Sequence, residues 1–164
     1  MLFNFNAPEV FRIAVEIEKN GKTFYEKAQG LLEDIGVKKL FEELARDEVE
    51  HGKEFSAMLA QLPPETASPA VWDPDNSLDQ YIKMMADQHV FVSGESLDAN
   101  LAKVKGLRDA LQLAIEFEKD SVIFFLSMQD ATDDKKAQEL ISLLVKEEQE
   151  HLRRLSLELR RMGN

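Results

Sequence analysis

Apolar side chains recur every three or four residues along most of the chain, which is the spacing of one buried helix face. This pattern predicts four long helices, over about residues 8–32, 36–61, 107–131 and 134–162. Pro63 and Pro64 end the second of them, and Thr132 and Asp133 are the expected N-terminal caps of the fourth. The apolar–polar alternation of a strand is almost absent, so we expect an all-α protein.

The segment between the second and third predicted helices differs in composition. Residues 62–78 contain four of the five prolines and are predicted to be a linker. Residues 79–105 are predicted to form one or two short helices, with a break near Ser93 and Gly94. We therefore expect one domain over residues 1–164, composed of a hairpin at 8–61, a crossover segment at 62–106 and a second hairpin at 107–162.

The two hairpins repeat one another at an offset of 100 residues, without a gap. Residues 14–19 (AVEIEK) align with 114–119 (AIEFEK), and residues 48–51 (EVEH) align with 148–151 (EQEH). Two helical hairpins of one design, joined by a long connection, predict an antiparallel four-helix bundle with pseudo-twofold symmetry.

Four glutamates and two histidines interrupt the apolar faces of these helices. They are Glu18, Glu48, His51, Glu118, Glu148 and His151. Burial of an unpaired carboxylate is costly, and no Lys or Arg lies on these faces at the same level, so a metal ion is the simplest compensating charge. In each hairpin the two glutamates lie equally far from the turn, so all four carboxylates are expected to meet in the middle of the bundle.

The spacing of these residues indicates the kind of metal. Each Glu-x-x-His pair, at 48–51 and 148–151, projects from one side of its helix. Two such pairs and one Glu from each remaining helix are the ligand set of carboxylate-bridged di-iron or di-manganese bundles. Four carboxylates balance two divalent cations, and this donor set suits iron or manganese better than copper. We expect two iron ions, with manganese or zinc as alternatives.

Other residues near this level have competing interpretations. Tyr25 lies two turns after Glu18, where its hydroxyl can bind a ligand carboxylate or have an unrelated partner in the core. Gly21 and Ser121 are small, which suits either a metal cavity or close helix packing. His89 stands alone in the connecting segment and is expected to be structural or solvated.

Composition narrows the range of functions. The chain has 20 Lys plus Arg, 31 Asp plus Glu, a formal net charge of −11 and no cysteine. The acidic balance argues against binding to nucleic acid or to an anionic membrane. The lack of cysteine excludes an iron–sulfur or rubredoxin centre within these residues. Neither a membrane span nor a signal-peptide pattern is present, so we expect a cytoplasmic protein, with Glu50 and Glu150 as surface charge.

The segment EKNGKTFY at residues 18–25 precedes Glu-x-x-His at 48–51, and the second hairpin repeats this as Glu118 and Glu-x-x-His at 148–151. This combination resembles the rubrerythrin branch of the ferritin-like superfamily. The resemblance implies a ferritin-like bundle, commonly a homodimer, with a non-haem di-iron centre that reacts with hydrogen peroxide or dioxygen. It also implies a role for each ligand: bridging for Glu48 and Glu148, terminal or bridging for Glu18 and Glu118, and terminal nitrogen for His51 and His151.

Two features depart from that family. Rubrerythrins usually have a rubredoxin domain that supplies electrons, so this cysteine-free chain needs an external electron-transfer protein. They also usually have an extra glutamate where this chain has Ser121, and the remaining six-ligand set is similar to that of bacterioferritins as well. We therefore expect a di-iron oxidoreductase that reduces hydrogen peroxide or dioxygen. The first alternative is an iron-binding protein that oxidises ferrous iron, and the second is a helical interaction module with a structural metal.

Overall fold

The computed structural model describes residues 5–67, 75 and 77–163, and every regular element in this part of the chain is helical. The long helices are α1 (Ala7–Gln29), α2 (Ile35–Ala60), α5 (Leu107–Asp130) and α6 (Lys135–Arg161). Between α2 and α5 the chain forms a 3-10 turn, η1 (Pro64–Ala67), and two short helices, α3 (Ser77–Asp87) and α4 (Gly94–Leu101). The all-α prediction is confirmed. Among the described helices, none has the length and apolarity needed to cross a membrane.

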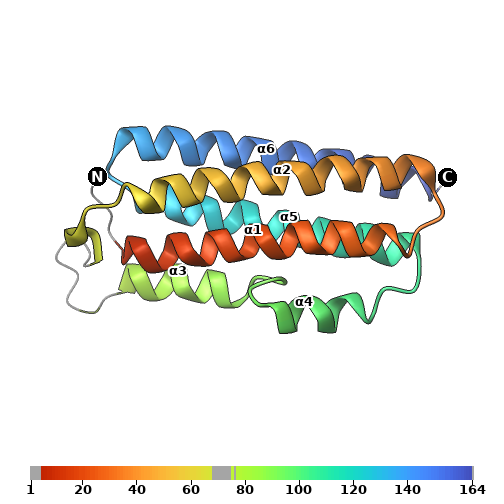
Figure 1. Cartoon of the computed structure of the whole chain (residues 1–164), viewed down its shortest axis with the longest axis horizontal. Coiled ribbons are helices and arrows are strands. Elements are labelled where there is room, and N and C mark those ends of the chain that lie inside the picture. The colour runs from red at the N-terminus through yellow and green to blue at the C-terminus, as the bar shows by residue number, and fades with distance from the viewer. Residues whose placement is uncertain (1–4, 68–74, 76, 164) are drawn as a thin grey trace.

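The four long helices form a bundle of two antiparallel hairpins (Figure 1). α1 packs along α2 and α5 along α6, and the hairpins meet through contacts of α1 with α5 and of α2 with α6. α3 and α4 lie outside the bundle, where α3 contacts α1 and α5, and α4 contacts α1 (Figure 1). The predicted four-helix bundle with a helical crossover is thus confirmed.

The helix starts are set by side-chain caps. Asp34 accepts a hydrogen bond from the backbone N–H of Val37 at 2.8 Å, and Asp134 accepts one from Ala137 at 2.9 Å. The expectation that Thr132 or Asp133 would cap the fourth helix is wrong. Asp134 has the extended backbone that points its carboxylate at the first free N–H groups of α6, whereas the Thr132 hydroxyl donates to a carbonyl at the end of α5.

The boundaries of the first helix and of the linker also differ in detail from the prediction. α1 ends at Gln29 rather than near Leu32, because the N–H groups of the next residues bond three positions back in tight turns. Within the predicted linker, η1 is a 3-10 turn, and residues 68–74 and 76 lie outside the described residues. The one or two short helices predicted over residues 79–105 are two, α3 and α4, and Ser93, at the predicted break, is the N-cap of α4.

Aromatic rings pack the crossover segment between α2 and α5 against the bundle. The ring of Phe91, from the segment between α3 and α4, lies 4.9 Å from that of Phe24 on α1 and 5.1 Å from that of Phe117 on α5, between ring centroids. Asn20 donates a hydrogen bond to the Phe91 carbonyl at 2.9 Å. Rings at this separation add stabilisation beyond the area they bury, so the crossover is a packed part of the core.

Candidate metal centre

Six side chains from all four long helices converge in the interior of the bundle. They are Glu18 from α1, Glu48 and His51 from α2, Glu118 from α5, and Glu148 and His151 from α6, each at most 3 % exposed. These are the six residues that the sequence placed on the apolar faces.

The six residues form two overlapping groups. Glu18, Glu48, His51 and Glu148 make one group, and Glu48, Glu118, Glu148 and His151 make the other. Within each group the candidate ligand atoms all lie within 4.8 Å of one another. Because Glu48 and Glu148 belong to both groups, the arrangement suits two neighbouring metal ions with these two carboxylates between them.

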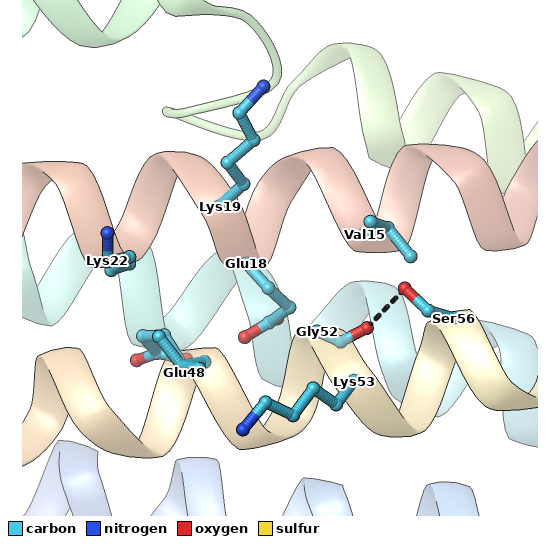
Figure 2. Close-up of a pocket in the computed structure, with 9 residues that line it drawn as sticks. Val15, Glu18, Lys19, Lys22, Glu48, Gly52, Lys53 and Ser56 are labelled. Atoms are coloured by element: carbon cyan, nitrogen blue, oxygen red, sulfur yellow. Dashed lines mark hydrogen bonds between the residues drawn. The ribbon is translucent and has the colours of Figure 1, made fainter.

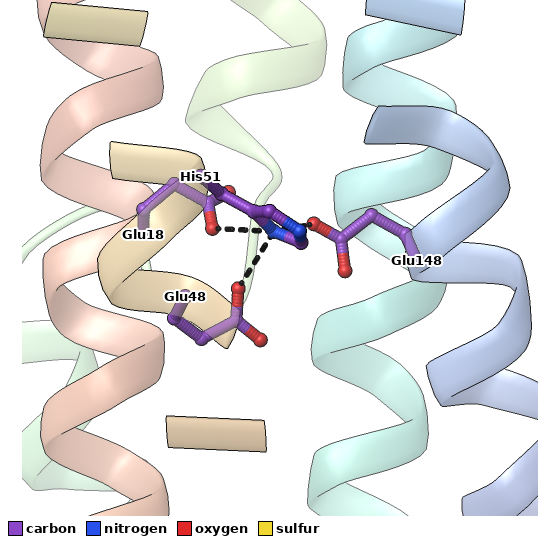
Figure 3. A group of neighbouring side chains, drawn as sticks. All are labelled: Glu18, Glu48, His51 and Glu148. Atoms are coloured by element: carbon purple, nitrogen blue, oxygen red, sulfur yellow. Dashed lines mark ion pairs between the residues drawn. The ribbon is translucent and has the colours of Figure 1, made fainter. Parts of the chain in front are cut away.

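Both imidazoles point their Nδ1 atoms into the cluster. Nδ1 of His51 lies 3.5 Å from a carboxylate oxygen of Glu18, 3.3 Å from one of Glu48 and 2.8 Å from one of Glu148 (Figure 3). Nδ1 of His151 lies 3.0 Å from Glu148 and 3.5 Å from Glu118. Each histidine can thus give its Nδ1 to one metal ion.

The hydrogen bonding of the cluster fits a metal-binding site. Throughout the described residues, the buried side-chain nitrogen and oxygen atoms that lack a hydrogen-bond partner all belong to these six residues. They include both oxygens of Glu18, Glu48 and Glu148, and Nδ1 of both histidines. Proteins rarely leave so many buried polar atoms unpaired, and a donor set of carboxylate oxygen and imidazole nitrogen fits iron, manganese or zinc.

The outer nitrogens of the two histidines bind carboxylates from the opposite hairpin. Nε2 of His51 lies 2.8 Å from Oε2 of Glu147, and Nε2 of His151 lies 3.2 Å from Oδ2 of Asp47. Such partners fix the tautomer of a metal-binding histidine and raise its basicity. The sequence analysis missed Asp47 and Glu147, although they too repeat at an offset of 100 and directly precede the shared glutamates.

Tyr25 is in contact with the cluster. Its buried hydroxyl donates a hydrogen bond to Oε1 of Glu118, across the bundle from α1 to α5. Burial and the negative charge of Glu118 raise the pKa of Tyr25 well above its usual value, so the hydroxyl stays protonated and remains a donor. Of the two interpretations of Tyr25, the structure favours the one in which it binds a ligand carboxylate. The equivalent position in the second repeat is Phe125, so this contact exists on one side only.

Crowding of carboxylates changes the protonation of the site. Burial, reinforced by the charge of Glu148, raises the pKa of Glu118 to about 8 and also raises the pKa of Glu18 and Glu48. Burial lowers the pKa of His51, but the adjacent Glu148 outweighs this effect and the net pKa is raised. In the absence of a cation the cluster therefore holds protons that a metal ion would have to displace.

The two small residues near the cluster serve packing and hydrogen bonding. A Cβ atom on Gly21 would overlap the ring of Phe117, so close helix packing requires the glycine. The buried hydroxyl of Ser121 lies 3.0 Å from Nε2 of His89. His89 accepts a hydrogen bond from the backbone N–H of Phe91 through Nδ1, and burial lowers its pKa to about 3. His89 is thus a neutral, buried residue that links the crossover to α5, in line with its structural interpretation.

A bundle of two helical hairpins around a buried cluster of glutamate and histidine is the arrangement of ferritin-like carboxylate proteins. The chain belongs to the rubrerythrin family, whose family model matches residues 9–159. It is also similar to a solved structure described as a ferritin-like diiron-carboxylate protein from Thermotoga maritima. That similarity has a TM-score of 0.68 and 25 % sequence identity, and it covers 100 % of both chains. No curated protein matches the chain.

Proposed function

We propose that this protein is a non-haem di-iron oxidoreductase that reduces hydrogen peroxide, with dioxygen as a second oxidant. The observation that carries the proposal is the pair of overlapping ligand groups, in which buried atoms of Glu48, Glu148 and their neighbours lack partners. Membership of the rubrerythrin family and the similarity to a diiron-carboxylate protein support the choice of iron.

Each cluster residue then has a defined task. Glu18 and His51 would hold one iron ion, Glu118 and His151 would hold the other, and Glu48 and Glu148 would be shared by both. When bound, a pair of ferrous ions would supply the two electrons that, with two protons, convert one hydrogen peroxide into two waters.

The surrounding residues orient these ligands. The Tyr25 hydroxyl holds one oxygen of Glu118 in place, while Asp47 and Glu147 keep the Nδ1 atoms of the histidines turned inward. The six cluster residues are at most 3 % exposed, so bulk water is kept from their ligand atoms. This arrangement leaves the metal ligands preorganised before an oxidant arrives.

Electrons have to come from elsewhere, because these residues contain no cysteine and hence no rubredoxin centre. We propose that a separate electron-transfer protein returns the iron to its ferrous state after each turnover. We further propose a homodimer as the working assembly. Ile123 and Leu143, on the outer sides of α5 and α6, are 48 % and 55 % exposed and would gain from such burial.

Anaerobic stopped-flow mixing tests the proposal. Metal-free protein is loaded with two equivalents of ferrous iron and mixed with hydrogen peroxide or with dissolved oxygen. We expect iron oxidation much faster than that of free ferrous ion, with peroxide the faster oxidant. Oxidation no faster than that of free ferrous ion would overturn the proposal.

Ferrous-iron oxidation and iron binding is the second candidate function. Ser121 favours this function. It lies one turn after Glu118, its hydroxyl contacts His89, and it adds no further carboxylate to the cluster. This function predicts iron loading well beyond two ions per chain and a large assembly, whereas the peroxidase predicts that loading stops at the two groups. If the metal has only a structural role, Glu48→Ala and Glu148→Ala should abolish assembly. Even the wild type should then show no redox chemistry.

A further inference from the structure

A cavity of about 360 Å³ lies beside the cluster, on the outer side of the first hairpin. We call it the α1–α2 cavity. Its lining includes Glu18 and Glu48, two of the six cluster residues, and Gly52 on the next turn of α2 (Figure 2). The cavity therefore reaches the side chains of two candidate ligands from the outside, while their carboxylate oxygens stay buried directly behind its wall.

Gly52 has no packing reason to be glycine. A Cβ built at this position would meet its nearest neighbour, Cβ of Glu18, at 3.6 Å, which is an ordinary contact. Gly21, in contrast, is required because Phe117 fills the space above it. Glycine in a helix interior is less stable than alanine, so Gly52 weakens α2 without any gain in packing.

The internal repeat shows what another side chain would do there. Gly52 directly follows His51, and the equivalent residue after His151 is Leu152. The two hairpins thus share the Glu-x-x-His pair but differ at the next residue. A leucine at position 52 would extend from α2 toward Glu18 and fill the α1–α2 cavity.

The walls of the cavity suit a small neutral molecule. Val15 and Val49 give it apolar surface, and lysines from both helices contribute their hydrocarbon stems. The ammonium groups are paired with glutamates next to the cavity, in the pairs Lys19–Glu16, Lys22–Glu26 and Lys53–Glu50. Because each of these ammonium groups is balanced by a carboxylate, a neutral molecule such as hydrogen peroxide meets little net charge at the rim.

We propose that the α1–α2 cavity is the route by which hydrogen peroxide reaches the cluster, and that Gly52 is the residue that keeps the route open. The inference rests on the proposed function. It adds the path of the oxidant and the residue that leaves room for it.

Two substitutions at one position test the route. Gly52→Leu copies the second repeat and closes the cavity, whereas Gly52→Ala adds only the Cβ that the structure can accommodate. Both variants are loaded to the same iron content as the wild type and mixed anaerobically with hydrogen peroxide. We expect Gly52→Leu to be oxidised at least about tenfold more slowly, and Gly52→Ala to stay within about twofold of the wild type. A Gly52→Leu protein that holds its iron and is oxidised at the wild-type rate would overturn the route, whereas slow oxidation of the wild type itself would count against the proposed function.

A second measurement needs neither turnover nor a folded variant. In zinc-loaded wild-type protein, dissolved oxygen under pressure broadens the NMR signals of the methyl groups that it can reach. We expect the methyl signals of Val15 and Val49 to broaden more than those of Ile115, the equivalent of Val15 in the second repeat. Equal broadening of these signals would contradict an open path on the α1–α2 side.

Discussion

Asp47 on α2 lies 3.2 Å from the outer nitrogen of His151 on α6, and thereby joins the two hairpins at the level of the cluster. The repeat supplies the reciprocal contact, in which Glu147 binds His51. Each hairpin therefore positions the histidine of the other. Since the carboxylate accepts the Nε2 proton, Nδ1 is left free to bind a metal ion.

Loss of this contact is expected to weaken metal binding. Removal of a partner behind a metal-bound histidine typically lowers affinity about 10–100-fold, and we expect Asp47→Ala to fall in this range. Glu54→Ala is the matched control, because Glu54 is an exposed acid on the same helix. Competition titration against a chelator measures both affinities. Equal affinities for the two variants would show that the Asp47 contact has no effect on the site.

Tyr25→Phe is expected to destabilise the metal-free protein more than the loaded one. The substitution removes the donor to Oε1 of Glu118, and a buried acceptor left unpaired costs about 1–3 kcal/mol. A metal ion on Glu118 offsets part of this loss. Denaturant unfolding with and without zinc measures the difference, and Tyr81→Phe, at a 44 % exposed tyrosine, is the control. A stability loss that zinc does not reduce would argue against metal binding by Glu118.

Metal binding near pH 7 is expected to release protons. The pKa of Glu118 is raised to about 8, and the pKa values of Glu18, Glu48 and His51 are also raised, so the metal-free cluster is partly protonated at this pH. Metal ions bind the deprotonated forms, so affinity rises with pH. Zinc titration of weakly buffered protein in a pH-stat counts the protons, and Glu118→Gln should release fewer. Binding without proton release would contradict the protonation described for the cluster.

The free energy of unfolding is expected to depend on pH through His89, at pH values below the pKa that His89 has in the unfolded chain. Burial lowers the folded pKa of His89 to about 3 from its usual 6.5, so the unfolded chain binds a proton that the folded chain excludes. The contribution of His89 is complete above pH 6.5 and is lost as pH falls toward 3, by about 1.4 kcal/mol per pH unit. The stability advantage of the wild type over His89→Gln should therefore shrink by about 2 kcal/mol between pH 6.5 and pH 5. An advantage that is constant with pH would mean that His89 is not held neutral.

The sequence predicted those parts of the structure that depend on local pattern. Helical periodicity located the four long helices. Acidic residues on the apolar helix faces indicated Glu18, Glu118 and the other buried ligand candidates, because residue spacing alone shows which side chains lie on a buried face. The offset of 100 then related the two halves of the site.

The remaining features depend on contacts between distant segments. Asp47 and Glu147 are 45 % and 61 % exposed and lie beside the apolar face, so only the packing of α2 against α6 shows that they reach a histidine. His89 meets Ser121 because the crossover folds back onto the bundle, which no periodicity reveals. The first repeat has Gly52 where the second has Leu152, and this difference matters because a cavity formed by α1 and α2 lies beside Gly52.

We propose that the six cluster residues bind two metal ions and share Glu48 and Glu148 between them. Anaerobic titration of metal-free protein with ferrous iron tests it most directly, on the wild type, Glu18→Ala and Glu148→Ala. We expect two tightly bound ions per chain for the wild type and one for Glu18→Ala, because Glu18 belongs to one group only. For Glu148→Ala we expect loss of tight binding at both positions, because Glu148 belongs to both groups. A wild type that binds fewer than two ions, or a Glu148→Ala protein that binds two with unchanged affinity, would show that the six residues do not form a shared two-metal site.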